Sequence, residues 1–534
     1  MIIKANKQIG FIYKDNESID KILKDGDVVF ERGFLREKTS TTLPITFGGV
    51  GKNLKDYRVY GNTVQNGTPT PDTPIDMVSC GDRTKNLYNN DTSTKTILSL
   101  QGVETENDSW TTSDYIKIKK NLDYIFSWQP IVTSNFYWQT RVSCYDSNKQ
   151  FISGENLNSY PGTNKFYQTI TNIPENTEYI RISFSNRVDS NSERKNVQLE
   201  EGSVNTSYEP YGYKIPVNVR SDNLFNKDNT TKLNGTISVS YDRFESGGLN
   251  CCIVIPCKSN TTYTVEKRND GNTNRFALAS SETIPSSTSG EPTPLLNKIR
   301  GDASSNLSLT TGLTANYLIV QYYRTAESVL TEQQILDSIM IIEGSTAPSK
   351  YIPYYNQTTN IYLDEPLRKI DGYSDYIDFI NGKVVRNIKE VVLDGSESWF
   401  TAVTRNSYNK VARQFLLGNA ILNQGNSSNI TKSTNFRSES ANNIYSNSSI
   451  GINCIGISDS GYLRIGLDLT VFPGDNSFKT WLSENNVTVD YVLATPTEES
   501  ITLPNIPTID GNNTLNIETE ITPSQVYIKY KSNT

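Results

Sequence analysis

Aromatic rings and planar polar groups recur along one stretch of the chain in a pattern that suits sugar binding. Four residues form it: Tyr137, Gln139, Arg141 and Tyr145. Odd-numbered positions share one face of a β-strand, because successive side chains point to opposite faces. Aromatic planes can stack on pyranose rings, while amide and guanidinium groups bond to sugar hydroxyls. The alternative is that these are ordinary exposed strand residues or part of a subunit contact.

Other residues of the same types could extend such a site. Trp110 lies in a polar loop between Ser109 and Thr111, where a core position is hard to justify. Three later residues of the same types are Arg275, Gln321 and Tyr323, which occupy strand positions whose side chains we expect to face solvent or a ligand. We therefore expect two related faces for a ligand or partner.

Paired carboxylates are the other chemistry to consider, because glycosidases use two of them about 5–10 Å apart. Glu200 and Glu201 are neighbours, and Asp371, Asp375 and Asp378 form a cluster. Such groups are usually solvated, or occasionally bind calcium, and no acid and nucleophile stand out. We therefore expect no enzyme activity and no cofactor. A surface-glycan hydrolase is the lesser alternative, and the sequence gives no support for a structural calcium ion.

The residues that are missing narrow the chemistry further. The chain has no histidine, which excludes Ser-His-Asp and Cys-His catalysis and His-ligated zinc. None of its six cysteines forms a CxxC motif, so a zinc knuckle or thioredoxin-like site has no support. Cys144 and Cys257 lie in apolar strand patterns and suit small core positions.

Composition predicts an all-β protein. Only 35% of the 534 residues are apolar, and 31 tyrosines stand against 3 methionines. Aromatic and β-branched residues favour strands, while Asn, Gly, Ser and Pro supply turns. The net charge of −7 disfavours nucleic acid as a partner. No segment has the roughly 20 apolar residues of a membrane span, and the first residues lack the apolar core of a signal peptide, so we expect synthesis in a cytoplasm.

A domain-sized unit occurs twice. Each copy opens with Asn-Leu-aromatic-Asn, at 86–89 and 223–226, and closes with Glu-Gly-Ser followed by Tyr-x-Pro-Tyr, at 201–211 and 343–354. Within the two copies, Tyr124 corresponds to Tyr263 and Arg141 corresponds to Arg275. Two divergent copies in tandem favour a protein that presents surfaces. The closing Tyr-x-Pro-Tyr strings suit a structural role, with Pro fixing the exit path.

Period-two alternation places the inner face of each copy. The shared apolar positions are Tyr124, Phe126, Trp128, Val142, Cys144, Ile180, Ile182 and Phe184 in the first copy, and Tyr263, Val265, Phe276, Leu278, Leu318, Val320 and Tyr322 in the second. They predict two-sheet, jelly-roll-like sandwiches. Elsewhere, Asn381-Gly382 predicts a hairpin and residues 477–484 predict a helix.

We therefore expect tandem β-sandwiches between small terminal β units. The predicted order is an N-terminal docking unit (1–40), a Pro/Gly-rich connector (41–84), the first sandwich (85–213), the second sandwich (214–356), connecting strands with a hairpin (357–390) and a C-terminal β domain (391–534).

Several strings resemble minor tail and baseplate-associated proteins of phages and prophages of Gram-positive bacteria. They are Tyr57–Asn62 with the following Thr-Pro run, both Tyr-x-Pro-Tyr closures, Tyr376–Val384 and Tyr491–Thr497. The resemblance covers most of residues 50–534 and implies carbohydrate-binding jelly-roll modules in a virion tail or baseplate component released by lysis. It also implies a bacterial surface glycan and other tail proteins as partners, and a homo-oligomer such as a trimer. A purely structural baseplate role is the alternative.

Overall fold

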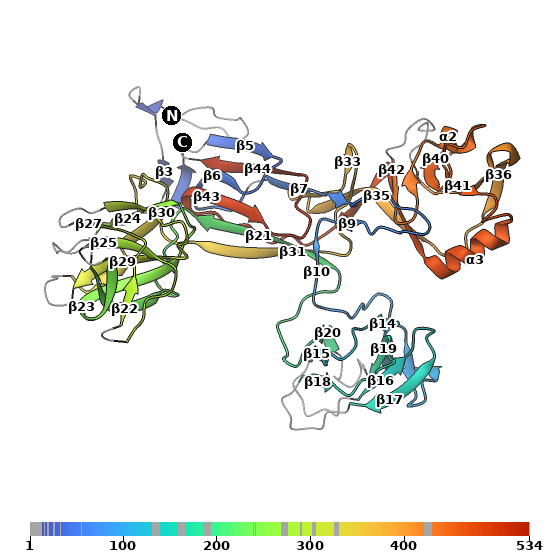
Figure 1. Cartoon of the computed structure of the whole chain (residues 1–534), viewed down its shortest axis with the longest axis horizontal. Helices are drawn as coiled ribbons and strands as arrows, with labels where there is room; N and C mark the ends of the chain where they lie inside the picture. The colour runs from blue at the N-terminus through green and yellow to red at the C-terminus, as the bar shows by residue number, and fades with distance from the viewer. Residues whose placement is uncertain are drawn as a thin grey trace.

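The computed structural model describes residues 13–14, 17–18, 21–24, 27–31, 34–54, 56–130, 139–157, 166–185, 194–238, 240, 242–268, 276–288, 291–301, 306–324, 330–420 and 430–532, with side chains from residue 35 onward except those of 130, 323 and 324. Almost every regular element in this part is a strand, so the prediction of a multidomain all-β chain is confirmed. Figure 1 shows a central body with lobes extending from it. No helix among the described residues is long and apolar enough to cross a membrane.

Two sheets form the central body. The five-stranded sheet contains, in spatial order, β10 (Asp82–Arg83), β21 (Tyr213–Ser221), β43 (Asp510–Ile517) and β6 (Ile45–Val50), with β31 (Asn356–Leu363) also paired to β21. The seven-stranded sheet contains β38 (Thr431–Ser433), β42 (Val487–Ser500), β35 (Lys383–Leu393), β34 (Tyr376–Asp378), β7 (Asp56–Tyr60), β44 (Gln525–Ser532) and β5 (Phe34–Ser40). Apolar side chains of both sheets, including Phe47, Tyr57 and Val217, bury one common core.

The strands of this body come from distant parts of the chain. Val219 pairs with Leu515, and Leu515 pairs in turn with Ile45 on its other side. Residues 84–212 lie between β10 and β21, residues 222–355 between β21 and β31, and residues 394–486 between β35 and β42. The lobes are therefore three insertions into one discontinuous sandwich (Figure 1).

This nesting differs from the linear order of domains expected from the sequence. Residues 41–84 supply β6 and β7 of the body rather than a connector, and residues 357–390 supply β31, β34 and most of β35. The last part of the expected C-terminal domain returns to the body as β43 and β44. The sequence of a short strand does not indicate which strand it pairs with when that partner lies hundreds of residues away.

The first lobe is a sandwich of two sheets. One contains β13 (Trp110–Thr112), β19 (Tyr179–Ser185), β16 (Thr140–Tyr145) and β17 (Phe151–Asn156), with β14 (Ile116–Lys117) paired to β19. The other contains β18 (Tyr167–Ile170), β15 (Tyr124–Pro130) and β20 (Arg194–Glu201). A hairpin of β11 (Thr96–Leu98) and β12 (Glu104–Glu106) completes the lobe.

The second lobe repeats this plan. Its larger sheet contains β22 (Thr231–Ser238), β23 (Arg243–Pro256), β29 (Tyr317–Arg324), β25 (Phe276–Ser281) and β27 (Asn297–Gly301), with β26 (Pro292–Pro294) on β23. The smaller contains β28 (Asn306–Thr310), β24 (Thr262–Lys267) and β30 (Ile339–Glu343), and α1 (Glu332–Leu336) precedes β30. Tyr124 pairs with Glu201 as Tyr263 pairs with Glu343, so the two repeats also share a register.

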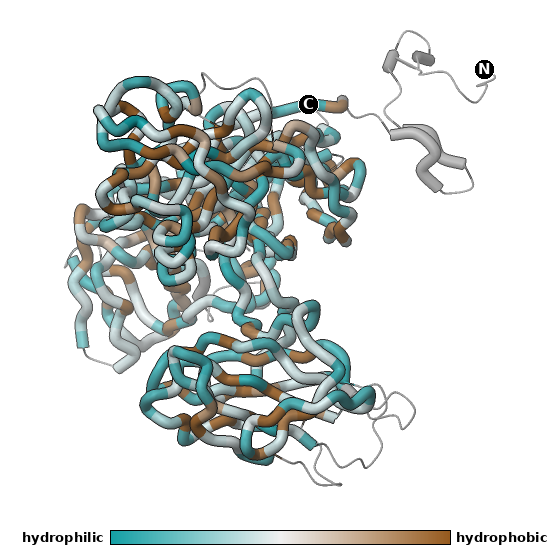
Figure 2. Tube along the Cα trace, turned by 90° about the vertical axis from the view of Figure 1, so that its right-hand side faces the viewer, coloured by the Kyte–Doolittle hydropathy of each residue, from teal (hydrophilic) through white to brown (hydrophobic). Residues whose placement is uncertain are grey.

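The predicted inner faces of both repeats are confirmed. All eight shared positions of the first repeat and all seven of the second are buried, and they lie in one apolar cluster per lobe. Figure 2 shows hydrophobic segments running through the lower lobe, with hydrophilic segments around them.

The third lobe packs helices on a sheet. The sheet contains β36 (Phe400–Arg405), β37 (Lys410–Leu416), β41 (Tyr462–Asp468), β40 (Cys454–Ile457) and β39 (Arg437–Ser438), and a 3-10 turn, η2 (Asn406–Tyr408), links the first two. The helices are α2 (Ala441–Tyr445) and α3 (Asp475–Asn485), and α3 confirms the predicted helix at 477–484. Phe478 and Leu482 of α3 join a core with Trp399.

Small two-stranded pieces account for the remaining strands. They pair β1 (Tyr13–Lys14) with β2 (Glu17–Ser18), β3 (Lys21–Lys24) with β4 (Asp27–Glu31), β8 (Thr63–Val64) with β9 (Val78–Ser79), and β32 (Lys369–Ile370) with β33 (Tyr373–Ser374). The predicted hairpin at Asn381-Gly382 is confirmed between β34 and β35, where Asp378 pairs with Lys383.

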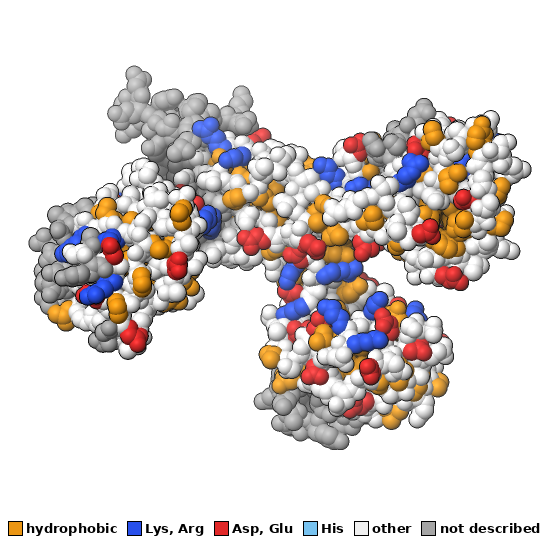
Figure 3. All heavy atoms as spheres, in the orientation of Figure 1, with side chains coloured by type: hydrophobic (Ala, Val, Ile, Leu, Met, Phe, Trp, Pro, Cys, Tyr) orange, Lys and Arg blue, Asp and Glu red, His pale blue; other side chains and the backbone are white. Residues whose placement is uncertain are grey.

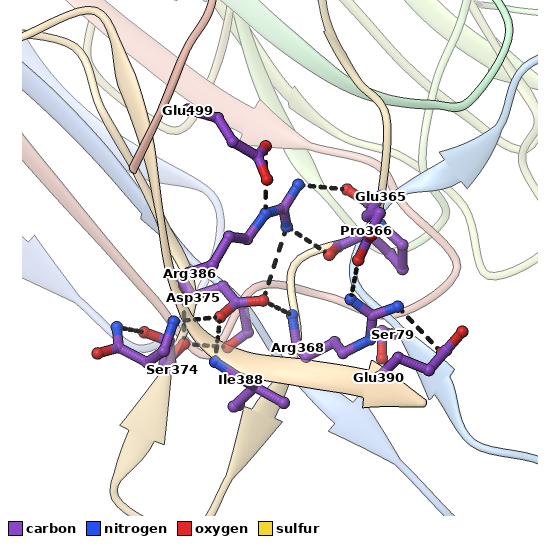
Figure 4. A network of polar contacts seen from close by, with 12 residues as sticks. Ser79, Glu365, Pro366, Arg368, Ser374, Asp375, Arg386, Ile388, Glu390 and Glu499 are labelled. Atoms are coloured by element: carbon purple, nitrogen blue, oxygen red, sulfur yellow. Dashed lines mark hydrogen bonds and ion pairs between the residues drawn. The ribbon is translucent and has the colours of Figure 1, made fainter. Parts of the chain in front are cut away.

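A buried polar network lies beside β35 in the central body (Figure 4). β35 and β42 pair with each other, and their register shifts between Arg386 and Ile388. The fully buried Asp375 carboxylate accepts hydrogen bonds from the backbone N–H groups of Arg368 at 3.1 Å, Asn387 at 2.8 Å and Ile388 at 3.0 Å. It therefore provides an acceptor for the backbone amides at this bulge. Arg368 in turn lies 3.3 Å from Asp490 of β42. In the structure this carboxylate of the predicted cluster therefore has a structural role within the central body.

Candidate functional site

The structure brings some of the predicted sugar-binding residues together on the outer face of the β13–β19–β16–β17 sheet. The Arg141 guanidinium lies over the Trp110 ring at 5.1 Å, and Tyr145 follows on the same strand. Gln139 precedes β16, and its carbonyl oxygen accepts bonds from the Ser185 amide and the Arg194 guanidinium, both at 3.0 Å. Tyr137 lies outside the described residues.

The expectation that this face is open is wrong for two of these residues, because other segments of the same lobe cover them. The rings of Tyr115 and Phe151 pack edge to face on Tyr145 at 4.9 Å and 5.9 Å, and the β11–β12 hairpin lies over the Arg141 side of the face. Trp110 is 8% exposed and Tyr145 is 3% exposed. Arg141 donates a 2.6 Å bond to the Leu98 carbonyl of β11, and Leu98 itself is fully buried. The β11–β12 hairpin is held down further by Arg181, which pairs with Glu104 at 2.8 Å.

The second repeat covers its equivalent face in another way. Gln321 is 2% exposed, and its side-chain oxygen accepts a 3.0 Å bond from the Ile237 amide. Ile237 and Phe244, near the tip of the β22–β23 hairpin, pack there on Ala277 and other apolar residues. Arg275 and the side chain of Tyr323 lie outside the described part.

A different feature of the repeats forms a cleft in each lobe. The opening Asn-Leu-aromatic-Asn string and the closing Tyr-x-Pro-Tyr string, far apart in sequence, meet in space. In the first lobe they border a cleft of about 860 Å³, and we call it the first-repeat cleft. Its lining includes Tyr88, Asn89, Asn90, Asp91, Lys95, Arg194, Lys195, Asn196, Tyr208, Pro210 and Tyr211, with Asp364 and Glu365 of the central body.

The second lobe has a cleft at the corresponding place. This second-repeat cleft measures about 260 Å³ and is lined by Phe225, Asn226, Lys227, Asp228, Leu336, Asp337, Tyr351, Pro353 and Tyr354. Tyr208 and Tyr351, the matching first tyrosines, are each 39% exposed. Lys227 and Asp337 form a 2.5 Å ion pair within the lining of the smaller cleft. The two clefts therefore share their aromatic residues and differ in size and charge pairing.

One buried asparagine organises each cleft. The Asn86 amide nitrogen donates to the carbonyls of Val197 and Glu209, both at 3.1 Å, while its oxygen accepts from the amides of Tyr88 at 2.9 Å and Leu199 at 3.0 Å. The opening string is thereby tied to the last strand and to the closing string.

Asn223 repeats this arrangement in the second lobe. It donates to the Ile352 carbonyl at 2.9 Å and accepts from the amides of Phe225 and Ile341, both at 3.0 Å. The repeated strings of the sequence are thus the elements that build the clefts.

The walls of the first-repeat cleft combine aromatic, amide and cationic groups. Tyr208 and Tyr211 keep 39% and 37% of their surface exposed, which differs from the packed structural role predicted for them. Arg194 is held by stacking 4.2 Å from the Trp128 ring and by a 3.0 Å bond to Thr140. Burial lowers the pKa of the Arg194 guanidinium to about 9, which leaves it charged at neutral pH.

The cleft lies at the neck between the first lobe and the body. Asp364 and Glu365, between β31 and β32, belong to its lining and to the body. Figure 3 shows charged side chains of both signs gathered where the lower lobe meets the body. No group of three or more Cys, Asp or Glu side chains within the described ranges could hold a metal ion.

Sequence reasoning chose the strand face and passed over the cleft. The signal that could have found it was the recurrence of two tyrosines around a proline at the end of both repeats. The sequence does not show that the closing string contacts the opening string of its own repeat in the folded protein.

Comparisons with known proteins add little. No family model matches the chain. No curated protein matches it. Among solved structures, the N-terminal CBM22-1-CBM22-2 tandem domain of Xyn10C from Paenibacillus barcinonensis is similar over 50% of this chain and 98% of its own, with 8% identity and a TM-score of 0.18. The structure of infectious bursal disease virus Gt strain is similar over 96% and 84%, with 9% identity and a TM-score of 0.07. TM-scores this low support no conclusion about ligand or function.

Proposed function

We propose that the chain is a non-catalytic adhesion component of a phage tail or phage-like particle, and that its first-repeat cleft binds a glycan of a bacterial surface. One observation carries the glycan proposal: both repeats place the same pair of tyrosines beside the same asparagine-rich turn, around a cleft. Exposed aromatic planes with nearby amides are the chemistry that sugar recognition uses.

The chemistry of the first-repeat cleft fits a saccharide. Tyr208 and Tyr211 offer ring faces for pyranose rings. Lys195 and Asn196 are both exposed beside them, and Asn196 is held by a 2.6 Å bond to Gln129, so both can meet hydroxyl groups of a ligand. A volume of about 860 Å³ is in the range of small-ligand sites, roughly 300–1,000 Å³.

The second-repeat cleft is a weaker candidate. At about 260 Å³ it falls below that range, and its Lys227–Asp337 pair satisfies charges that a ligand would otherwise meet. Weak single sites are sufficient on a particle that carries many copies, because later contacts become effectively intramolecular.

The tail assignment draws on the strings that resemble tail proteins, and these strings build the scaffold. Tyr57–Asn62 and Tyr376–Val384 form β7, β34 and the start of β35 in the seven-stranded sheet. Gly61 there sits so close to the Leu367 and Arg368 backbone that a Cβ would come within 2.6 Å of it. A central body that presents separate lobes suits a particle component, with tail proteins and further copies of the chain, such as a trimer, as partners.

The test is binding of the full-length protein to isolated wall glycans of the host, followed by calorimetry. Tyr208→Ala should weaken binding by tenfold or more, while Tyr208→Phe, which keeps the stacking face, should stay within about threefold. Tyr373→Ala is the matched control, because Tyr373 is 36% exposed and lies in the central body. Unchanged affinity in Tyr208→Ala and Tyr211→Ala would refute the cleft as the binding site.

The second candidate is a purely structural baseplate role. The observation in its favour is the position of Asp364 and Glu365 in the cleft, since residues of the body suit a joint between two domains. A folded, correctly assembled protein that binds no host glycan would support this role over adhesion.

A further inference from the structure

The third lobe carries an exposed aromatic and cationic face that no other part of the molecule covers in the described residues. It lies on the outer side of the β36–β37–β41 part of the sheet. Helix α2 covers the far end of that side, where Ala412, Ile444 and Cys454 pack together. The near end remains open, with Phe400, Leu416, Tyr462 and Arg464. Together with Tyr445 at the end of α2 and Arg405 at the end of β36, these residues form what we call the third-lobe face.

Strand register arranges this face. Phe400 pairs with Gln414 and Gln414 with Arg464, so the three side chains stand in one row across three strands. Leu416 and Tyr462 form the next row. Phe400 is 42% and Leu416 62% exposed, and the Phe400 and Tyr462 rings meet edge to face at 5.7 Å. This half of the face is therefore apolar and partly exposed.

The other half is cationic. The guanidinium groups of Arg464 and Arg405 lie 4.9 Å and 5.4 Å from the centre of one ring, that of Tyr445, which is itself 43% exposed. Two like charges thus converge on a single aromatic ring. A cation–π contact at a partly exposed site is a weak interaction, so the ring offsets little of the repulsion between the two charges.

Neither guanidinium has a carboxylate partner in the described part of the chain. Arg405 donates one bond, to the Tyr445 carbonyl at 3.2 Å, and its Nε is buried without a partner. Arg464 donates to Gln414 and to the Ala441 carbonyl, both at 3.0 Å. Asp459 acts on Arg464 electrostatically but forms no ion pair with it. An arginine has five N–H donors, so both retain donors for an anion.

We propose that the third-lobe face is a second binding site, specific for an acidic polysaccharide. A carboxylate or phosphate of the ligand bonds to Arg405 and Arg464, and the adjoining sugar ring rests on Phe400 and Tyr462. Arginine suits both acid groups because its planar donors can engage two oxygens at once. The net charge of −7 argues against nucleic acid, and so does the presence of only two arginines in the third-lobe face, because nucleic acid needs a broad basic surface.

This site is in a different lobe from the first-repeat cleft and stands without it. The test therefore uses the full-length protein carrying Tyr208→Ala, so that a glycan bound in the cleft does not mask the result. The probes are polygalacturonate and its neutral methyl ester for the carboxylate source, and phosphorylated and plain dextran for the phosphate source.

We expect one or both acidic polymers to bind and the neutral ones to bind at least tenfold more weakly. Arg405→Gln and Arg464→Gln should each weaken binding by tenfold or more, Arg405→Lys should restore part of it, and added salt should weaken it further. Arg220→Gln is the matched control, because it removes the same charge from an exposed position in β21. Unfolding curves of the variants would show that the lobe remains folded.

Three results would overturn the proposal. One is equal binding of acidic and neutral polymers or no binding of either. Another is unchanged affinity in folded Arg405→Gln and Arg464→Gln. The last is tighter binding of a single-stranded oligonucleotide than of any polysaccharide.

Discussion

Replacing Asn86 with alanine should selectively destabilise the first lobe. The Asn86 side chain is 3% exposed and makes four hydrogen bonds that tie three separate segments together. A buried hydrogen bond contributes a net of about 0.5–1.5 kcal/mol, so loss of all four costs about 2–6 kcal/mol of unfolding free energy. For a lobe of this size, a loss near 4 kcal/mol lowers its melting temperature by roughly 15 °C.

Differential scanning calorimetry of the full chain is the appropriate assay, because separate lobes can unfold in separate transitions. Asn223→Ala should shift a different transition by a similar amount, which assigns each transition to a repeat. Asn148→Ala is the control, since Asn148 lies at an exposed turn of the same lobe. A loss below about 1 kcal/mol in Asn86→Ala would refute the view that this residue closes the repeat.

Two further predictions concern the covered face and the buried polar network. Arg141→Ala should cost about 2–4 kcal/mol of stability, because it removes a charged hydrogen bond to Leu98 and a stacking contact with Trp110, yet glycan affinity in calorimetry should not change. Burial raises the pKa of Asp490 from 3.8 to about 7. Between about pH 4 and pH 7 the folded state therefore keeps a proton on this carboxyl group that the unfolded state has released. Its contribution to stability is therefore greatest below about pH 4 and is lost as the pH rises through about 7; urea unfolding at pH 5 and pH 8 should show this loss, and Asp490→Asn should reduce it.

Local patterns of the sequence predicted the interior of the repeats well. Alternation at Tyr124, Phe126 and Trp128 identified buried positions because strand periodicity is a property of neighbouring residues. The same locality explains the correct helix at 477–484, which starts after a turn and buries Phe478 and Leu482.

The exposed faces could not be predicted in the same way. Tyr145 and Gln321 have the parity of solvent-facing residues, but they are 3% and 2% exposed because segments of their own lobes fold over them. Parity assigns a side chain to one side of a sheet and says nothing about what lies above that side.

The sequence by itself determined the fold class, the existence of two related repeats and the inner face of each, since these follow from composition and short-range periodicity. Only the tertiary structure decided that the three lobes are insertions into one central sandwich, that hairpins cover the expected faces, and that the repeat ends meet to form clefts. Each of these depends on contacts between residues far apart in the chain, such as Val219 with Leu515 or Asn86 with Glu209. Such contacts are selected by the burial and hydrogen bonding of the whole fold, and local residue patterns leave them open.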